Sequence, residues 1–233
     1  MSVSVVVFPG SNCDQDVLWV FREILGLRTG FVWHKDSRLP PETRLVVLPG
    51  GFAYGDYLRA GAIARFSPIM QAVKRHAEAG GLVVGICNGF QVLTEAGLLP
   101  GALARNAGLK FICRDVWLRI ENAETVLTSR ARPGDVLRMP ISHHDGRYIA
   151  PPGLLEELER SGDVVLRYAT AAGETTPEAN LNGSENAIAG IRNRQGNVFG
   201  LMPHPDRAAE ELLGSAEGLV LLGSLADHLK AAA

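Results

Sequence analysis

The chain has 233 residues, of which 46% are hydrophobic and 21% charged, and its net charge is −2 at pH 7. These values are typical of a globular protein and exclude disordered, collagen-like and coiled-coil chains. The balanced charge gives no sign of a nucleic acid partner, and no apolar run approaches the roughly 18 residues of a membrane span, so neither nucleic acid nor membrane binding is expected.

The first half of the chain alternates short apolar runs with amphipathic stretches. Strands are predicted there at Ser4–Phe8, Phe31–His34, Leu45–Leu48 and Leu82–Ile86. Helices are predicted after a cap at Ser11 or Asn12, from Ser67-Pro68 to Gly80-Gly81, and at Asn88–Ala96. Because buried parallel strands consist of continuous apolar runs, this alternation predicts a parallel sheet with helices on both faces.

The second half of the chain contains shorter runs of alternating character. Strands are predicted at Phe111–Ile120, Val136–Ile141, Val164–Tyr168, Ile188–Arg192 and Val198–Met202, and a final helix at Ala216–Lys230. The last two strands flank a turn with Gly196, which predicts an antiparallel hairpin. We therefore expect one α/β domain over residues 1–233, an open, three-layer, mostly parallel sheet of flavodoxin-like type with an antiparallel extension in its C-terminal half.

The N-terminus and the cysteines indicate where the protein works. The first apolar run ends at Pro9-Gly10 without preceding basic residues, so it is interpreted as a buried strand and not as a signal peptide. The 3 cysteines are Cys13, Cys87 and Cys113. Without an export signal they predict reduced thiols and a cytoplasmic location. None forms a Cys-x-x-Cys pair, so no structural zinc site is expected. No metal and no cofactor is assigned to this chain.

Glycine is unusually frequent, with 26 residues, which is about 11% against an ordinary share of about 7%. Part of the surplus follows the predicted parallel strands, at Gly10, Gly50, Gly51, Gly85 and Gly89. Open parallel sheets bind their ligands at the carboxyl ends of the strands. The glycines therefore predict one active face along that edge of the sheet.

Cys87 lies in the segment Gly85-Ile86-Cys87-Asn88-Gly89, between an apolar strand and a helix. This is the cysteine version of the nucleophile elbow, a strained turn in which the flanking glycines prevent clashes. The sulfur then faces a helix N-terminus, where the helix dipole favours the reactive thiolate. Cys87 is therefore predicted to be a nucleophile, whereas Cys13 is interpreted as part of a helix cap and Cys113 as a buried structural residue.

A thiolate that attacks a carbonyl group needs a base and a group that orients the base. His204 follows a predicted strand, and prolines on both sides restrict the backbone around it. Asp206 lies two residues further on, close enough to hold the imidazole in one tautomer. Cys87, His204 and Asp206 are therefore predicted to form a catalytic triad.

The same reaction needs hydrogen-bond donors for the oxyanion that forms when the nucleophile attacks. The amide of Asn88, directly after the nucleophile, is one predicted donor. The second is predicted in Gly50-Gly51-Phe52, which ends a neighbouring strand, and is assigned to the amide of Gly51. Gly50, Gly51, Phe52 and Asn88 are thus the predicted oxyanion and substrate-binding residues.

Several segments along the whole chain resemble one family of enzymes. They are Phe8–Asp14, Pro49–Ala64, Gly85–Gln91, Leu93–Gly101, Ile188–Ile191 and Gly200–Pro205. The elbow is typical of class I, or triad, glutamine amidotransferases. The long Gly50–Ala64 and Leu93–Gly101 segments are similar to the glutaminase subunits of phosphoribosylformylglycinamidine synthase, which implies the class I glutamine amidotransferase-like fold.

The resemblance implies a reaction shared between subunits. Cys87 would attack the side-chain amide of L-glutamine to form a thioester, His204 would protonate the departing ammonia and activate water, and Asp206 would orient His204. The ammonia would pass to a synthetase subunit, accompanied by a small accessory subunit. The synthetase would use ATP and Mg²⁺ to convert formylglycinamide ribonucleotide to formylglycinamidine ribonucleotide in purine biosynthesis. This chain has no Gly-x-x-x-x-Gly-Lys-Ser/Thr phosphate loop, in agreement with that division.

Two segments depart from the family pattern. Asp206 stands where the family has glutamate, whose side chain is one methylene longer. Ser142–Tyr148 stands where the family has Ala-His-Gly-Glu-Gly, and the adjacent His143 and His144 are interpreted as a solvated loop.

Other functions are open on the sequence alone. One is a glutaminase for guanylate or pyridoxal phosphate synthesis, which the Gly50–Ala64 segment disfavours. A second is a peptidase or chaperone with a cysteine elbow, which the His204-Pro205-Asp206 sequence disfavours. A third is a regulatory subunit that binds glutamine without catalysis, which the presence of all three triad residues disfavours.

Overall fold

The apolar strands of the first half pair in parallel, as their composition predicts. In the computed structural model, which describes residues 2–231, β1 (Ser2–Val7) lies between β2 (Thr29–Trp33) and β3 (Thr43–Leu48). β3 is followed by β4 (Leu82–Ile86), again in parallel. The ends of the predicted domain, residue 1 and residues 232–233, lie outside the described part of the chain.

The second half continues the same sheet in the antiparallel sense. β11 (Val198–Leu201) pairs in parallel with β4 and antiparallel with β10 (Ile188–Arg192). Beyond β10 come β9 (Val164–Ala169), β6 (Ile112–Ile120) and β7 (Val136–His143), all antiparallel. The resulting nine-stranded sheet has the order β2-β1-β3-β4-β11-β10-β9-β6-β7, and β5 (Ala102–Ala104) with β8 (Arg147–Ile149) forms a separate pair.

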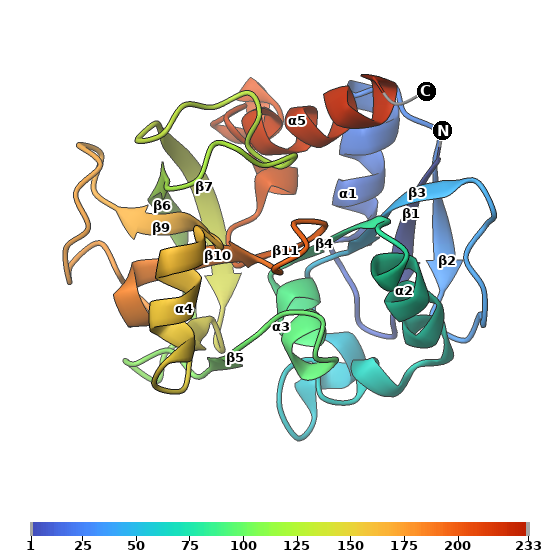
Figure 1. The fold of residues 1–233 in the computed structure, drawn as a ribbon, viewed down its shortest axis with the longest axis horizontal. Helices are drawn as coiled ribbons and strands as arrows, with labels where there is room; N and C mark the ends of the chain where they lie inside the picture. Colours follow the sequence, from blue (N-terminus) through green and yellow to red (C-terminus); the bar gives the residue numbers. More distant parts are fainter. Residues whose placement is uncertain (1, 232–233) are drawn as a thin grey trace.

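Helices cover both faces of this sheet (Figure 1). On one side lie α2 (Pro68–Glu78), α3 (Asn88–Glu95) and α4 (Leu154–Ser161), and on the other α1 (Asp14–Trp19) and α5 (Gly218–Ala231). α1 continues as a π-helix at Val20–Ile24, and short 3₁₀ segments are found at Ala53–Asp56, Ala64–Phe66, Glu185–Ala187, Pro205–Arg207 and Glu211–Leu213. The predicted fold class, a three-layer α/β sheet with an antiparallel extension, is confirmed.

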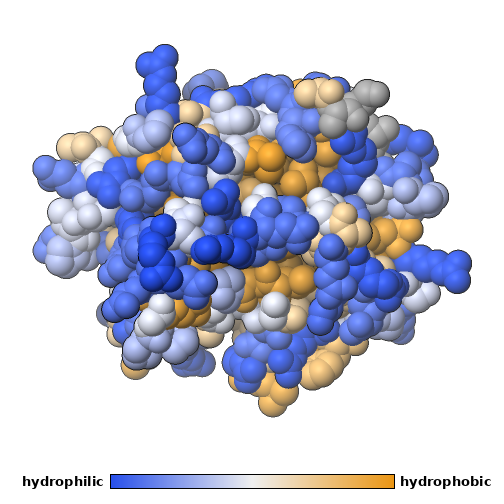
Figure 2. Space-filling view, viewed as in Figure 1, coloured by the Kyte–Doolittle hydropathy of each residue, from blue (hydrophilic) through white to orange (hydrophobic). Residues whose placement is uncertain are grey.

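Apolar side chains from all three layers form one continuous core. β4 is buried along its whole length, because helices cover both its faces and strands flank both its edges. Figure 2 shows that the outer face over α2, α3 and α4 is mostly hydrophilic, with apolar colour in patches between the helices. No helix among residues 2–231 has the length and apolar character needed to cross a membrane.

Some local predictions differ from the structure. α1 begins one residue later than a cap at Asn12 would place it, because Cys13 is the N-cap and Ser11 Oγ accepts a hydrogen bond from the Phe8 amide instead. α4 was not predicted, since only Leu158 in its single short amphipathic run is fully buried. Cys113 lies in β6 as expected, but its side chain is exposed, so its interpretation as a buried residue is wrong.

The β10–β11 hairpin is attached to the end of α2 by one buried side chain, which gives a stability prediction. Asn197 Nδ2 donates hydrogen bonds to the carbonyls of Ala77 and Gly81, both at 2.8 Å. Asn197→Ala removes both hydrogen bonds and should lower the free energy of unfolding by about 1–3 kcal/mol in urea titrations. Gln195→Ala, at an exposed position of the same turn, should change it by no more than about 0.5 kcal/mol.

Candidate active site

The register of the parallel strands brings the predicted site residues to one edge of the sheet. Leu48 of β3 lies opposite Gly85 of β4, and Leu201 of β11 lies opposite Ile86. The three strands therefore end at nearly the same level. The segments that follow them carry Gly50 and Gly51, Cys87, and His204, so these residues meet although they are far apart in the sequence.

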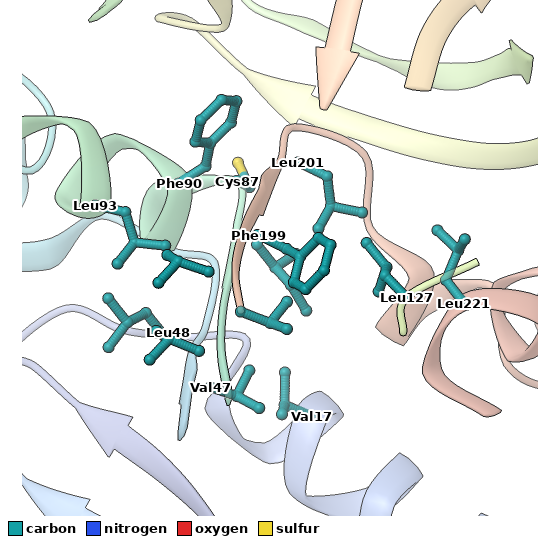
Figure 3. Packing of buried hydrophobic residues seen from close by; sticks show 14 of the residues in the cluster. Val17, Val47, Leu48, Cys87, Phe90, Leu93, Leu127, Phe199, Leu201 and Leu221 are labelled. Carbon is teal, nitrogen blue, oxygen red and sulfur yellow. The ribbon is translucent and has the colours of Figure 1, made fainter. Parts of the chain in front are cut away.

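Cys87 occupies a strained turn between β4 and α3. Its backbone angles are φ 50° and ψ −103°, outside the regions that non-glycine residues favour. A Cβ on Gly89 would collide with the carbonyl oxygen of Leu48, and one on Gly85 would lie 2.6 Å from the backbone of Gly89. These contacts agree with the role of both glycines in the predicted elbow. In Figure 3 the sulfur projects beyond the end of β4, between Phe90 and Leu201.

His204 and Asp206 are both buried directly beside this turn. The Asp206 carboxylate Oδ2 lies 3.5 Å from His204 Nδ1 at hydrogen-bonding geometry, and Oδ1 lies 3.4 Å away without making a hydrogen bond. His204 Nε2 has no hydrogen-bond partner among residues 2–231. The sulfur of Cys87 instead approaches the carbonyl of Ser142 at 3.7 Å. The Cys87–His204 hydrogen bond is thus not formed here, and such bonds often tighten only when substrate binds.

The surroundings of His204 favour its charged form. Burial alone would lower the pKa of the imidazole, but the charges of Asp206 and Cys87, the hydrogen bond that Asp206 accepts and the nearby Cys13 sulfur raise the pKa well above 6.5. An imidazolium next to a thiolate is the state in which a cysteine nucleophile is ready to attack and the histidine is ready to donate a proton.

Cys13 belongs to the same cluster, which the sequence prediction missed. It is the N-cap of α1, as interpreted, but its sulfur also accepts a hydrogen bond from Arg207 Nη2 at 3.1 Å. Its sulfur, one nitrogen of His204 and a carboxylate oxygen of Asp206 lie within 4.8 Å of one another, the one such group of metal-ligand types found in the described part of the chain. Because the Arg207 guanidinium occupies the sulfur, we assign no metal to this group.

The amides of three predicted oxyanion residues fall into two kinds, free and occupied. The amides of Gly51 and Asn88 donate to no acceptor among residues 2–231, so both are free to bind an oxyanion. Gly51 has φ +137°, and a Cβ there would lie 2.7 Å from the Asn12 amide nitrogen, which explains the need for glycine. The amide of Phe52 already donates to the Gly10 carbonyl at 2.9 Å, so it cannot be an oxyanion donor.

Gly50 lies against the histidine, which gives a second prediction. A Cβ at this position would lie 2.6 Å from His204 Cε1 and 3.1 Å from Cys13 Sγ. Gly50→Ala should therefore displace the ring and lower kcat by about 10²-fold for the glutamine hydrolysis that the sequence resemblance implies, measured as glutamate release. Gly30→Ala, where nothing lies within 4 Å, should leave kcat unchanged. Equal rates for both variants would contradict this role of Gly50.

The Asn88 side chain fixes the segment that follows β3. Its Oδ1 accepts a hydrogen bond from the Ala53 amide at 3.0 Å, and its Nδ2 donates to Asp56 at 3.1 Å and to Gln91 at 2.8 Å. Burial raises the pKa of Asp56 to about 6, and nearby Asp145 adds to this, although the hydrogen bond from Asn88 opposes it. The elbow and the glycine-rich segment are thus joined by side-chain contacts as well as by the sheet.

His143 does not lie in a solvated loop, so that interpretation is wrong. It is the last residue of β7 and is buried, whereas the next residue, His144, is partly exposed. His143 Nδ1 lies 3.1 Å from Asn106 Oδ1, which also accepts the Gly146 amide, so Nδ1 carries the proton. Burial, and secondly the charge of His204, lower the pKa of His143 to about 4, which keeps it neutral.

Comparison with known proteins agrees with this site. The pattern of the family described as "CobB/CobQ-like glutamine amidotransferase domain" matches residues 1–217. The chain is 54% identical over 225 residues to the phosphoribosylformylglycinamidine synthase subunit PurQ of Salinibacter ruber, which covers 97% of this chain and 95% of that one. It is also 54% identical to PurQ of Trichormus variabilis over 233 residues, with both chains covered completely.

The chain belongs to the PurQ family. A PurQ protein is a glutamine amidotransferase, the glutaminase subunit of phosphoribosylformylglycinamidine synthase in purine biosynthesis, and the function expected from the sequence is thereby confirmed. Among solved structures, a chain in the structure of PurLQS from Thermotoga maritima is similar with a TM-score of 0.86 and 43% identity, covering 98% of each chain. That chain therefore has the same fold as the one described above.

Proposed function

We propose that Cys87 is the nucleophile of this glutaminase and that His204 is its acid and base. The thiolate sulfur bonds to the side-chain amide carbon of L-glutamine, and the electron pair of the C=O bond moves to the oxygen. When the tetrahedral intermediate collapses, the C–N bond breaks and the nitrogen takes the proton of the His204 imidazolium, leaving as ammonia. The product on the protein is a Cys87 thioester.

The second half of the reaction restores the starting state. Neutral His204 accepts a proton from water while the water oxygen bonds to the thioester carbon. The C–S bond then breaks, which returns the thiolate and the imidazolium and releases glutamate. Asp206 orients His204 and stabilises its positive charge, while the free amides of Gly51 and Asn88 donate to the oxyanion in both halves. Gly50 and Phe52 shape the walls around these groups.

The ammonia is used by another subunit. We propose that a synthetase subunit binds at the active edge, consumes the ammonia with ATP and Mg²⁺ to make formylglycinamidine ribonucleotide, and is joined by a small accessory subunit. Large apolar side chains exposed after β3, Tyr57 at 74%, Leu58 at 89% and Phe66 at 74%, support a docking surface there. Free thiols at Cys13, Cys87 and Cys113 support a cytoplasmic location.

The strained elbow is the observation that supports the mechanistic proposal, because Cys87 at φ 50° and ψ −103° lies outside the favoured regions, and backbone strain of this kind concentrates at functional sites. Incubation with diazo-oxonorleucine, an electrophilic glutamine mimic, should modify Cys87, and glutamine should protect it. Exposed Cys113 is the internal control, since a reagent that is not guided by the site should modify it first. An adduct on Cys113 alone, or none with the synthetase present, would contradict the proposal.

A further inference from the structure

We propose that Cys13 is a positioning residue for His204: its sulfur, held by Arg207, shares with Asp206 the orientation of the imidazole ring. This inference rests on the role of His204 proposed above and adds a group outside the triad. It also explains how this chain can use Asp206 where the family has the longer glutamate. Three contacts support it, made by Asp206, by Cys13 and by Arg207.

The contact of Asp206 with His204 is long. Both carboxylate oxygens lie 3.4–3.5 Å from Nδ1, and Oδ1 is buried without a hydrogen-bond partner. A hydrogen bond between an imidazolium and a carboxylate is ordinarily about 2.7–2.9 Å long. Asp206 lacks the methylene that would bring its carboxylate closer. The carboxylate alone therefore holds the ring loosely.

Cys13 fills the space that this leaves beside the ring. Its side chain is 3% exposed, and its sulfur lies within 4.8 Å of both the His204 nitrogen and the Asp206 oxygen. A Cβ added to Gly50 would contact both His204 Cε1 and Cys13 Sγ, so the imidazole ring and the sulfur pack against the same glycine. The proximity of the sulfur to the imidazole also helps to raise the pKa of His204.

Arg207 keeps the sulfur in place and is itself anchored to α1. Nη2 of Arg207 donates to Cys13 Sγ at 3.1 Å, and its Nε donates to Asp16 Oδ2, also at 3.1 Å. The negative charge of Asp206 also raises the pKa of Arg207, so the two groups attract each other. If the sulfur were removed, the guanidinium would be free to attract the Asp206 carboxylate away from His204. Cys13 thus prevents a competing ion pair as well as contacting the ring.

The titratable and charged groups around His204 come from four parts of the fold. They are Cys13 and Asp16 at the start of α1, Cys87 before α3, His143 at the end of β7, and Asp206 and Arg207 in the 3₁₀ segment after β11. Since Cys13 raises the pKa of His204, its removal should lower that pKa. The pH limb of kcat that reports loss of the His204 proton should therefore move to lower pH.

The test compares Cys13→Ala and Cys13→Ser with the wild type in the complete enzyme with its synthetase, with glutamate release as the readout. Cys13→Ala should lower kcat about 10–100-fold with KM for glutamine changed less than about twofold, and its pH limb should shift downward. Cys13→Ser, which keeps a small hydrogen-bonding group, should lie between the two. Cys113→Ala should match the wild type.

A second substitution that restores activity would show whether Cys13 positions the His204 ring or only fills space in the core. Adding Asp206→Glu to Cys13→Ala should restore most of kcat, because the longer acid reaches the ring without help from the sulfur. Wild-type kcat and pH profile in Cys13→Ala, an effect on KM alone, or failure of Asp206→Glu to rescue a folded Cys13→Ala would overturn the inference. If Cys13→Ala does not fold, the same criteria apply to Cys13→Ser. An active Cys87→Ala chain would instead refute the proposed function, so the two failures are distinct.

Discussion

A Cys87→Ala chain is expected to hydrolyse glutamine at least about 10⁴-fold more slowly than the wild type while it keeps its fold. The sulfur is the proposed covalent nucleophile, and the remaining oxyanion donors cannot form a thioester without it. Glutamate release by the complete enzyme measures the loss. Synthesis with added ammonium salt should continue at the wild-type rate, because the synthetase does not need Cys87 when ammonia is supplied.

The elbow allows this prediction to be separated from general damage. Cys87→Gly should be equally inactive, yet its free energy of unfolding should exceed that of Cys87→Ala by about 1 kcal/mol, because glycine tolerates φ 50°. Thermal unfolding of both variants measures the difference. Retention of glutamine hydrolysis by either variant, or loss of ammonia-dependent synthesis, would contradict the assigned role.

His143 alone is expected to lower the free energy of unfolding by about 3 kcal/mol between pH 7 and pH 4. Its pKa falls from 6.5 to about 4 on folding, so over this range the unfolded chain binds a proton that the folded chain does not. Stability is therefore lost as the pH falls. Urea unfolding at several pH values should show this dependence in the wild type and its absence in His143→Gln.

The comparison with the variant matters because other groups titrate nearby. The pKa of Asp56 rises from 3.8 to about 6 on folding, so Asp56 contributes stability as the pH falls, with the opposite sign. The pKa of His204 is raised, so its contribution is complete below pH 6.5 and is lost only at higher pH. His228→Gln, at an exposed position in α5, should behave as the wild type. Identical pH dependence in His143→Gln and the wild type would contradict the prediction.

The sequence predicts the fold best where a local residue pattern is compatible with only one secondary structure. β4 and β10 match their predicted ranges because a buried strand is a continuous apolar run bounded by polar or turn residues. α3 begins at Asn88 as predicted, since the elbow requires a helix directly after Cys87. β5 and β8 were missed because each has three residues and pairs only with the other, a contact that no local pattern announces.

In the site too, residues defined by local motifs could be predicted, whereas residues that depend on contacts between distant parts of the chain could not. Cys87, and His204 with Asp206, could be predicted because each lies in a short motif of its own. Cys13 could not be assigned to the site, since its contact with Arg207 joins residues at opposite ends of the chain. Its position after β1, at the same sheet edge as Cys87, was the available signal. His143 was misread because its burial depends on Asn106 and Gly146 closing over the end of β7.

β4 and β11 are direct neighbours in the sheet, and this pairing has a consequence for how the family can vary. Cys87 follows β4 and His204 follows β11, so the spacing between adjacent parallel strands, about 4.8 Å, sets the separation of nucleophile and base. Everything between α3 and β10 enters and leaves the sheet on the far side of β11. The exposed loops of that stretch can change in length or acquire new partners while the two strands hold nucleophile and base together. Only β7 within it must keep its place, because its Pro140 carbonyl accepts the His204 amide and its Ser142 carbonyl faces Cys87.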